Sequence, residues 1–324
     1  SFLESPWRSF WSICQVVVMW GVDSSQYIQT RGLYQDSLLF KGHRVENRLF
    51  MLITSLDPLI AYTHPSGFVR FSKNKFTKVN TKHQYLNMVT DMDLQYKSKN
   101  PDKWITSSGF KANISSRSLM LLFEKQPLSF NFQNDEYNLS KAFIQNQNKL
   151  LIVNLLSSLQ EKLRTNIQAV QTFPRRFFKL YGIDQFWMKN GSSMMYEING
   201  NSEIQPNVNK NNKLNFATIY SEMLNLIGVR WFKQSIRTIK PEYSMTENEI
   251  DSIISKQTKP DLSKLTEFEY RCVMQILDED SRRGQFVRVR LEDHLEKFSG
   301  YLNKLTYYLV KQGVTAQNGD LVYK

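Results

Sequence analysis

The sequence predicts an α+β or mixed α/β fold with a helical extension at its C-terminal end. Three observations support this prediction: strand-like apolar runs within residues 26–71, a strand hairpin over 180–199, and helical spacing of apolar residues from about 214 onward. A chain that places strands first and helices last is typical of a sheet packed against a separate helical layer.

The division into regions follows from composition. Residues 72–148 are rich in Lys, Asn, Gln and Ser and show little periodicity, which is typical of loops. We therefore expect residues 1–213 to form one region that holds a long polar insertion at about 72–148. In this prediction, residues 214–324 form the helical C-terminal extension.

The first region begins with strands. Residues 13–20 are apolar but too short to cross a membrane, and we interpret them as a buried strand rather than a signal segment. Residues 48–53 form a near-continuous apolar run, which is typical of a strand buried on both faces. A second strand is expected over 59–62. Residues 64–67 (HPSG) predict a tight turn, after which a third strand returns over 68–71.

The expected helices share apolar residues at intervals of three and four, so that one face of each is apolar. They cover residues 149–171, 216–227 (ended by Gly228), 247–256, 267–280 and 295–311.

Composition limits the classes of protein and partner. Hydrophobic residues make up 41% of the 324 residues, which excludes a disordered chain. Lys and Arg number 42 against 30 Asp and Glu, and this net charge of +12 favours an acidic partner: nucleic acid, an anionic membrane surface, a nucleotide or an acidic polypeptide. Two cysteines and four isolated histidines exclude a disulfide framework and a histidine-built metal centre. No apolar run reaches the roughly 18–20 residues of a membrane span.

Asn190 and Gly191 carry the strongest short hairpin signal in the chain. If these two residues form the turn, Lys189 faces Ser192, and the numbers of paired residues sum to 381. This register places two acidic residues, one on each strand, directly opposite each other.

The two acidic residues are Asp184 and Glu197, and Asn199 points to the same face two residues later. Two carboxylates and an amide oxygen on one face need a cation, and oxygen ligands suit Mg²⁺ completed by nucleotide phosphates. The alternative is a solvent-exposed face where two acids meet by chance, and a slip of one residue would move Asp184 off that face.

A second charged cluster lies on the early strands. Arg44, Glu46 and Arg48 share one strand face, and Arg70 lies on a neighbouring strand. One interpretation is a structural ion network on an edge strand. The other is a set of arginines that position phosphate or carboxylate oxygens by paired hydrogen bonds.

Six segments in the same order along the chain resemble the tubulin–tyrosine ligase-like family. They are residues 27–29 (YIQ), 42–48 (GHRVENR), 52–59 (LITSLDPL), 67–71 (GFVRF), 180–184 (LYGID) and 196–199 (YEIN). Residues 220–228 (YSEMLNLIG) are similar to the helix after the family's metal motif, and residues 278–286 (DEDSRRGQF) look like its polyglutamylase branch. The resemblance implies a partial ATP-grasp fold and ligation of amino acids to protein carboxyl groups.

The resemblance also implies roles for individual residues. The Mg²⁺–ATP ligands would be Asp184, Glu197 and Asn199. Arg48 and Arg70 would be catalytic, binding the acylphosphate region or the incoming amino acid, which we expect to be glutamate. The remaining cofactor-binding residues would be Gln29, Arg44, Glu46 and Asn87.

The sequence departs from the family pattern in three places. Residues 85–88 (YLNM) stand where the family has HLTN, and Glu46 is one methylene longer than the usual Asp. Residues 1–24 contain no lysine and only Gly21 as glycine, whereas the family has a phosphate-binding lysine strand and a glycine-rich loop. We expect these elements either in sequence before Ser1 or lost from a degenerate member.

Three hypotheses about function therefore stay open. The first is an ATP-dependent ligase acting on the acidic tails of tubulin, in the cytoplasm and cytoskeleton, with the cilium or basal body as a narrower location. The second is a catalytically inactive family member that serves as a structural or microtubule-associated component. The third is a nucleic-acid binder, suggested by charge alone and not by any recognised motif. Arginines 282, 283, 288 and 290 are expected to form a basic patch for the microtubule wall.

Overall fold

The computed structural model describes residues 37–40, 43–71, 113–115, 128–132, 135–139, 141–168, 178–188, 191–200, 210–228 and 241–324. The chain divides into two compact units. The first comprises Ser1–Phe50, Pro65–Leu151 and Tyr181–Gln205, and the second comprises Met51–His64, Ile152–Leu180 and Pro206–Lys324. The strand predicted over 13–20 lies outside the described residues.

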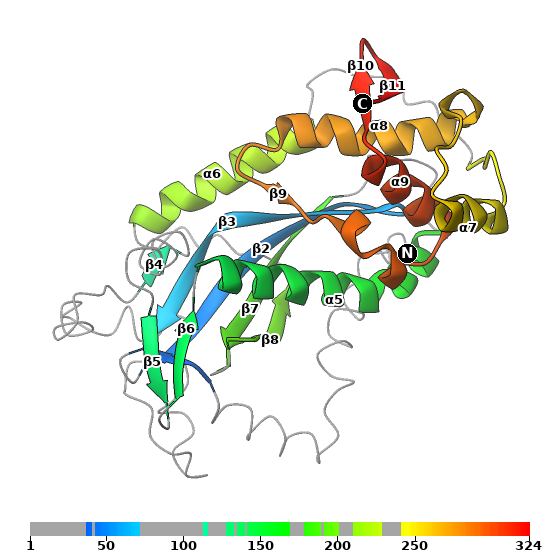
Figure 1. The fold of residues 1–324 in the computed structure, drawn as a ribbon. Coiled ribbons are helices and arrows are strands. Elements are labelled where there is room, and N and C mark those ends of the chain that lie inside the picture. The colour runs from blue at the N-terminus through cyan, green and yellow to red at the C-terminus, as the bar shows by residue number, and fades with distance from the viewer. Residues whose placement is uncertain are drawn as a thin grey trace, which may run out of the picture. The chain divides into compact units, whose positions relative to one another are not determined.

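One sheet organises the described strands (Figure 1), and its two long strands, β2 (His43–Leu56) and β3 (Leu59–Phe71), contribute to both units. Within the described ranges it has seven strands. The order is β4 (Asn113–Ser115), β3, β2, β7 (Lys179–Trp187) and β8 (Ser193–Asn199), with β1 (Leu39–Phe40) on β2 and β9 (Val287–Arg288) on β3. A separate antiparallel pair joins β5 (Leu128–Phe132) and β6 (Asp135–Leu139). With the helices below, this confirms the mixed α/β class.

The buried strand predicted at 48–53 is the centre of β2. Its apolar side chains from Leu49 to Ile53 are all buried, and so both faces of the strand are covered.

The tight turn predicted at residues 64–67 is wrong. β3 continues from Leu59 to Phe71, and His64 is buried within the strand. Its Nε2 atom lies 2.9 Å from Oε2 of Glu222, and its ring packs edge-on against Phe286 with centroids 4.7 Å apart. Pairing of β3 with β9 adds long-range hydrogen bonds at Tyr62 and Thr63. These tertiary contacts outweigh the local turn preference of Pro65 and Gly67.

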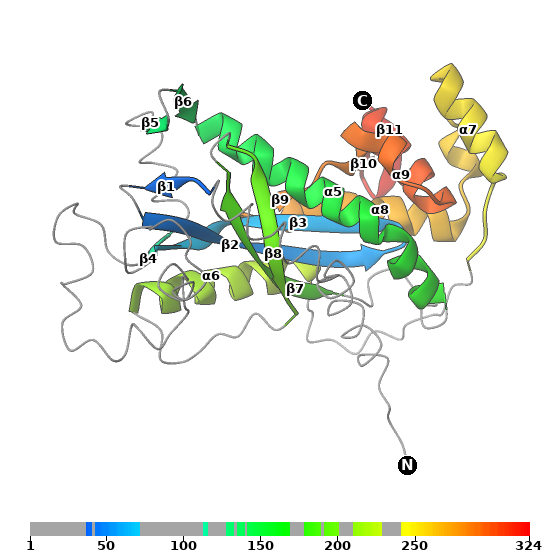
Figure 2. The same cartoon turned by 90° about the horizontal axis from the view of Figure 1, so that it is seen from below.

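The second unit holds a helical layer. Helices α7 (Glu247–Lys256), α8 (Glu267–Arg282) and α9 (Tyr301–Lys311) lie side by side (Figure 2). They pack around Ile250, Val273, Leu305 and Leu309, joined by the hairpin of β10 (Val314–Gln317) and β11 (Asp320–Tyr323). The other long helices are α5 (Lys141–Gln168) and α6 (Lys210–Ile227). None of the described helices combines the length and apolar character needed to cross a membrane.

The helix predicted over 295–311 begins too early. Residues Leu291–Lys297 form a short 3₁₀ segment, η4, and α9 starts only at Tyr301. Gly300 separates them with φ of +92°, a conformation that L side chains rarely adopt. A Cβ atom at Gly300 would also collide with the guanidinium of Arg164. The apolar pattern crosses this break, so the pattern alone could not locate it.

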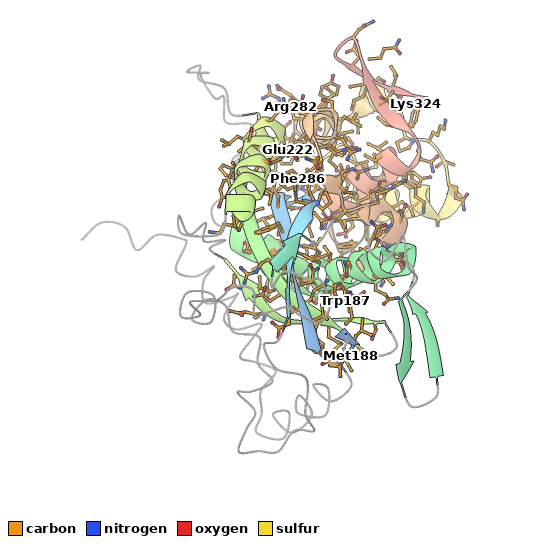
Figure 3. All side chains as sticks on the ribbon, turned by 90° about the vertical axis from the view of Figure 1, so that its left-hand side faces the viewer. Trp187, Met188, Glu222, Arg282, Phe286 and Lys324 are labelled. Carbon is orange, nitrogen blue, oxygen red and sulfur yellow. The ribbon has the colours of Figure 1, made fainter. Side chains whose placement is uncertain are left out.

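The C-terminal ends of α6 and α8 cap each other. Asn225 of α6 donates its Nδ2–H to the Arg282 carbonyl at 2.8 Å, and Arg282 donates from Nη2 to the Leu226 carbonyl at 3.0 Å. Figure 3 shows Arg282 near Glu222 of α6. The last carbonyls of a helix have no partner within it, so this exchange satisfies one such group on each helix.

Replacing Arg282 by Met is expected to lower the free energy of unfolding by about 1–2 kcal/mol, because the partly buried end of α6 loses its donor. The measurement is urea-induced unfolding followed by far-UV circular dichroism. Arg271→Met on the same helix is the matched control, since Arg271 also pairs with an acid four residues earlier, Glu267, but is 40% exposed. Its expected loss is at most about 0.5 kcal/mol. Equal losses in the two variants would contradict a capping role for Arg282.

The basic patch predicted at four arginines is not a free cationic surface. Arg282, Arg283, Arg288 and Arg290 each have a carboxylate oxygen within 3.5 Å, and so their charge is offset locally. Their acidic partners are Asp278, Asp280, Glu292 and Asp293. These partners lie within the same stretch of sequence, which a count of basic residues alone overlooks.

Candidate active site

Strands β7 and β8 form an antiparallel hairpin that brings together the three predicted metal ligands. Asp184 pairs with Glu197, and Gly182 pairs with Asn199. Directly paired residues of a sheet project from the same face. The predicted pairing of Asp184 with Glu197 is therefore confirmed, and Asn199 shares their face.

The route to this pairing differs from the prediction near the turn. Met188, at the loop end of β7 (Figure 3), donates its N–H to the Ser192 carbonyl at 2.8 Å, which encloses three residues rather than two. Gly191 has φ of +79° and donates its N–H to the Met188 carbonyl at 2.8 Å. A β-bulge next to Asp184 then shifts the register by one residue and restores the predicted pairing. The extra loop residue and the bulge therefore shift the register in opposite directions and offset each other.

Asp184 is buried, with 1% of its side chain exposed, and it accepts hydrogen bonds on both carboxylate oxygens. Arg48 of β2 donates from Nε to Oδ1 at 2.5 Å and from Nη2 to Oδ2 at 2.5 Å. Asn199 donates from Nδ2 to Oδ2 at 3.1 Å. This paired, charge-assisted arrangement is the strongest type of ion pair that proteins form, and it neutralises a carboxylate that burial would otherwise disfavour.

Gly182 gives the Arg48 side chain its path to Asp184. A Cβ atom on Gly182 would lie 2.9 Å from Cδ of Arg48, closer than real Cβ contacts. A glycine in the middle of a strand weakens it and often marks a close approach of another group. Here that group is the stem of Arg48.

The structure describes only some of the remaining predicted site residues. Glu46 is buried on β2, with 5% exposure, on the strand face that its spacing predicts. Arg44 and Arg70 belong to β2 and β3, but their side chains lie outside what the structure describes. Gln29 and Asn87 lie outside the described residues altogether. The roles assigned to these five residues stay predictions.

Asn148 is a site-supporting residue that the sequence did not reveal. Its Oδ1 accepts hydrogen bonds from Nε2 of Gln185 at 2.8 Å, Nε1 of Trp187 at 3.2 Å and Oγ of Ser193 at 2.9 Å. One oxygen atom therefore ties α5 to both strands of the hairpin. The residue falls at the end of the stretch predicted to be a polar insertion, where nothing in the spacing distinguishes it from its neighbours.

The oxygen-bearing side chains of this face fit a hard divalent cation by their chemistry. Within the described ranges, no group of three His, Cys, Asp or Glu side chains could hold a metal ion, so two carboxylates would need the amide oxygen of Asn199 as third ligand. Asp184 is buried and requires positive charge, which Arg48 supplies in this structure. Mg²⁺ prefers oxygen ligands of this kind and usually keeps several waters or phosphate oxygens.

Comparison with known proteins supports a family assignment. A family model described as the tubulin-tyrosine ligase family matches residues 34–236, a segment that includes β2, β3, the hairpin and the whole of α6. A search of the curated proteins found no match. Because the family model covers more than half of the 324 residues, the chain belongs to the tubulin-tyrosine ligase family.

Proposed function

We propose that this chain is an ATP-dependent ligase that adds an amino acid, glutamate, to the acidic tails of tubulin on an ATP-grasp-like fold. The observation that carries the proposal is the pairing of Asp184 with Glu197, with Asn199 on the same face, inside the segment that matches the family. Membership in a ligase family supports the reaction class. Glutamate as the added residue rests on the resemblance of residues 278–286 to the polyglutamylase branch.

The proposed reaction activates a carboxylate and then forms an amide bond. The γ-phosphoryl group of ATP moves to a glutamate side chain of the acceptor protein, which gives an acylphosphate and ADP. The amino group of the incoming amino acid attacks the acyl carbon, expels phosphate and loses a proton. No nucleophilic Ser, Cys or His is needed for these two steps.

The chain's own residues would bind and orient the reactants. Mg²⁺, when bound, would neutralise charge on the transferring phosphate. Its ligands would be Asp184, Glu197 and Asn199. Arg48 and Arg70 would hold carboxylate or phosphate oxygens. The nucleotide would contact Gln29, Arg44, Glu46 and Asn87.

The net charge of +12 suits an acidic protein substrate. Tubulin tails are the partner that family membership favours, with location in the cytoplasm and cytoskeleton, including the cilium or basal body. Among the described residues of the site, no feature calls for nucleic acid.

A second candidate is a catalytically inactive family member that serves as a microtubule-associated or structural component. The observation that favours it is the pairing of Arg48 with both carboxylate oxygens of Asp184, since this arrangement leaves the proposed metal ligand occupied. The departures at Glu46 and at residues 85–88 point the same way.

Glu197→Gln tests the proposed function. At about one hundred times its dissociation constant, Mg²⁺–ATP should raise the free energy of unfolding of the natural chain by about 2.7 kcal/mol, and Glu197→Gln should lose this gain. The readout is thermal unfolding with Mg²⁺–ATP, followed by a glutamate-incorporation assay on microtubules. Glu197 is exposed, so the substitution should not unfold the protein.

The matched control is Glu296→Gln, because this glutamate is also exposed, at 71%, but lies on η4. It should keep the full response to Mg²⁺–ATP. A folded natural chain that shows no response at any Mg²⁺–ATP concentration would exclude the ligase and favour the inactive form.

A further inference from the structure

The pairing of Arg48 with Asp184 poses a question that the proposed function leaves open. Both oxygens of the buried carboxylate accept N–H groups from one guanidinium at 2.5 Å. A divalent cation that used the same oxygens would have to lie close to the guanidinium, and the two positive charges would repel each other strongly at this separation. A cation that takes the lone pairs now used by Arg48 would therefore displace the guanidinium.

Asp184 needs positive charge beside it. With only 1% of the side chain exposed, an ionised carboxylate without a positive partner is strongly disfavoured. The Arg48 side chain is itself 13% exposed, so part of it reaches solvent. The pair thus combines a fixed anion with a cation on a long, flexible side chain.

The backbone accommodates this pairing. Gly182 lies two residues before Asp184 on the same strand face, and a Cβ atom there would lie 2.9 Å from Cδ of Arg48, so the stem would have to shift. The glycine is therefore independent support for the position of Arg48, because it concerns the path of the stem and not the charged ends.

We propose that Arg48 is an internal substitute for the divalent cation at Asp184, and that cation binding displaces its guanidinium. The displaced guanidinium becomes available to carboxylate or phosphate oxygens of the substrate, so the cation would load the site and release Arg48 in one step. This inference rests on the proposed function, since it assumes that Asp184 is a cation ligand. It assigns Arg48 a positioning role before any substrate arrives.

The test measures Mn²⁺ binding without nucleotide, from the loss of the free Mn²⁺ signal in electron paramagnetic resonance. Arg48→Met removes the competing charge and keeps an apolar stem. Because hydrogen bonds to charged groups of this kind are worth one to two powers of ten in an equilibrium constant, the affinity for Mn²⁺ should rise about ten- to hundredfold. Gly182→Ala leaves both charged groups in place and displaces only the stem, so it should raise the affinity in the same direction by a smaller factor.

The chain offers a closely matched control. Arg288 pairs with Glu292 through two hydrogen bonds, from Nη1 to Oε2 at 2.9 Å and from Nη2 to Oε1 at 2.6 Å. The exposed fractions of the Arg288 and Glu292 side chains, 13% and 1%, equal those of Arg48 and Asp184. Arg288→Met should therefore disturb the fold to a similar degree while the affinity for Mn²⁺ stays unchanged.

The outcomes are separable. Tighter Mn²⁺ binding in Arg48→Met and Gly182→Ala, but not in Arg288→Met, supports displacement. Binding by the natural chain that is lost in Asp184→Asn yet unaltered in Arg48→Met overturns displacement and leaves the proposed function standing. Absence of Mn²⁺ binding in the natural chain and in Arg48→Met overturns the inference together with the metal site, and thermal unfolding with Mg²⁺–ATP then shows whether nucleotide binding survives.

Discussion

Replacing Glu269 by Ala is expected to lower the free energy of unfolding by about 3–4 kcal/mol. Glu269 lies in the first turn of α8 and is fully buried. Its Oε1 accepts the N–H of Ser244 at 2.9 Å, the Ser244 hydroxyl at 3.0 Å and the hydroxyl of Tyr301. Its Oε2 accepts the N–H of Thr266 at 2.8 Å and the Thr266 hydroxyl at 3.1 Å.

The size of the expected loss follows from what the substitution leaves behind. Two backbone N–H groups, at Ser244 and Thr266, would lose their acceptor in a partly buried place, and each such group costs about 1–3 kcal/mol. Burial, together with the hydrogen bond to Glu269, raises the pKa of Tyr301, so its hydroxyl stays a donor and would lose the carboxylate that accepts from it. Urea titration followed by circular dichroism measures the loss, and hydrogen exchange of residues 242–282 would locate it.

The α8 helix begins with a capping box formed by Thr266 and Glu269, and the capping box at the start of α7 is the matched control. Thr246 and Glu249 form the same reciprocal capping box at the start of α7, with Thr246 N–H donating to Oε2 at 2.7 Å. Glu249 is fully exposed, so water replaces the lost acceptor when it becomes Ala. Glu249→Ala should therefore lower the free energy of unfolding much less than Glu269→Ala does. Similar losses would show that capping alone, and not the buried network, accounts for the effect.

Asp57→Asn is expected to stabilise the protein above pH 7 by about 2–3 kcal/mol. Burial raises the pKa of Asp57 from 3.8 to about 6, although the nearby charge of Arg164 lowers it in part. Its Oδ1 atom is buried and has no hydrogen-bond partner among the described residues. An ionised carboxylate is thus held where it is poorly solvated, and a neutral amide of the same shape avoids that cost.

The sign of the pH dependence follows from the two pKa values. The folded chain binds the Asp57 proton more tightly than the unfolded chain, so this group stabilises the fold below pH 3.8 and loses that contribution as pH rises to about 6. The difference between Asp57→Asn and the natural chain should therefore be near zero at pH 4, grow up to about pH 6 and stay constant above it. Thermal unfolding at a series of pH values measures it.

Because the prediction concerns the difference between Asp57→Asn and the natural chain, the contributions of other titrating groups cancel. Burial lowers the pKa of His64, which acts in the opposite direction as pH falls below 6.5, but it does so equally in both chains. Arg164→Met gives an independent check, because removal of this cation should raise the pKa of Asp57 further and enlarge the gain from Asp57→Asn. A gain that does not change with pH would contradict the role of ionisation.

Local signals in the sequence predicted those elements that local interactions determine. α7 spans Glu247–Lys256 as predicted, because its apolar spacing and its capping residues agree. The turn predicted at residues 64–67 is wrong, since pairing of β3 with β9 and the burial of His64 are set by residues far along the chain. The start of α9 is wrong because Gly300 interrupts an otherwise continuous apolar pattern.

The candidate site shows the same limit. The pairing of Asp184 with Glu197 was predictable within one hairpin, though through a two-residue turn that the structure replaces by a longer loop and a bulge. The pairing of Arg48 with Asp184 spans 136 residues and depends on β2 lying next to β7 in the sheet. Sequence spacing placed Arg48 beside Glu46 on β2, but it carried no information about the strand opposite.

The bulge next to Asp184 also divides the hairpin into two parts that differ in strand register. Between the loop and the bulge, β7 and β8 follow one register, and beyond the bulge they follow another that aligns Asp184 with Glu197 and Gly182 with Asn199. The length of the loop and the alignment of the acidic face are therefore specified by different residues. A loop with a different number of residues is compatible with the same alignment of the oxygen ligands, provided that the bulge absorbs the change.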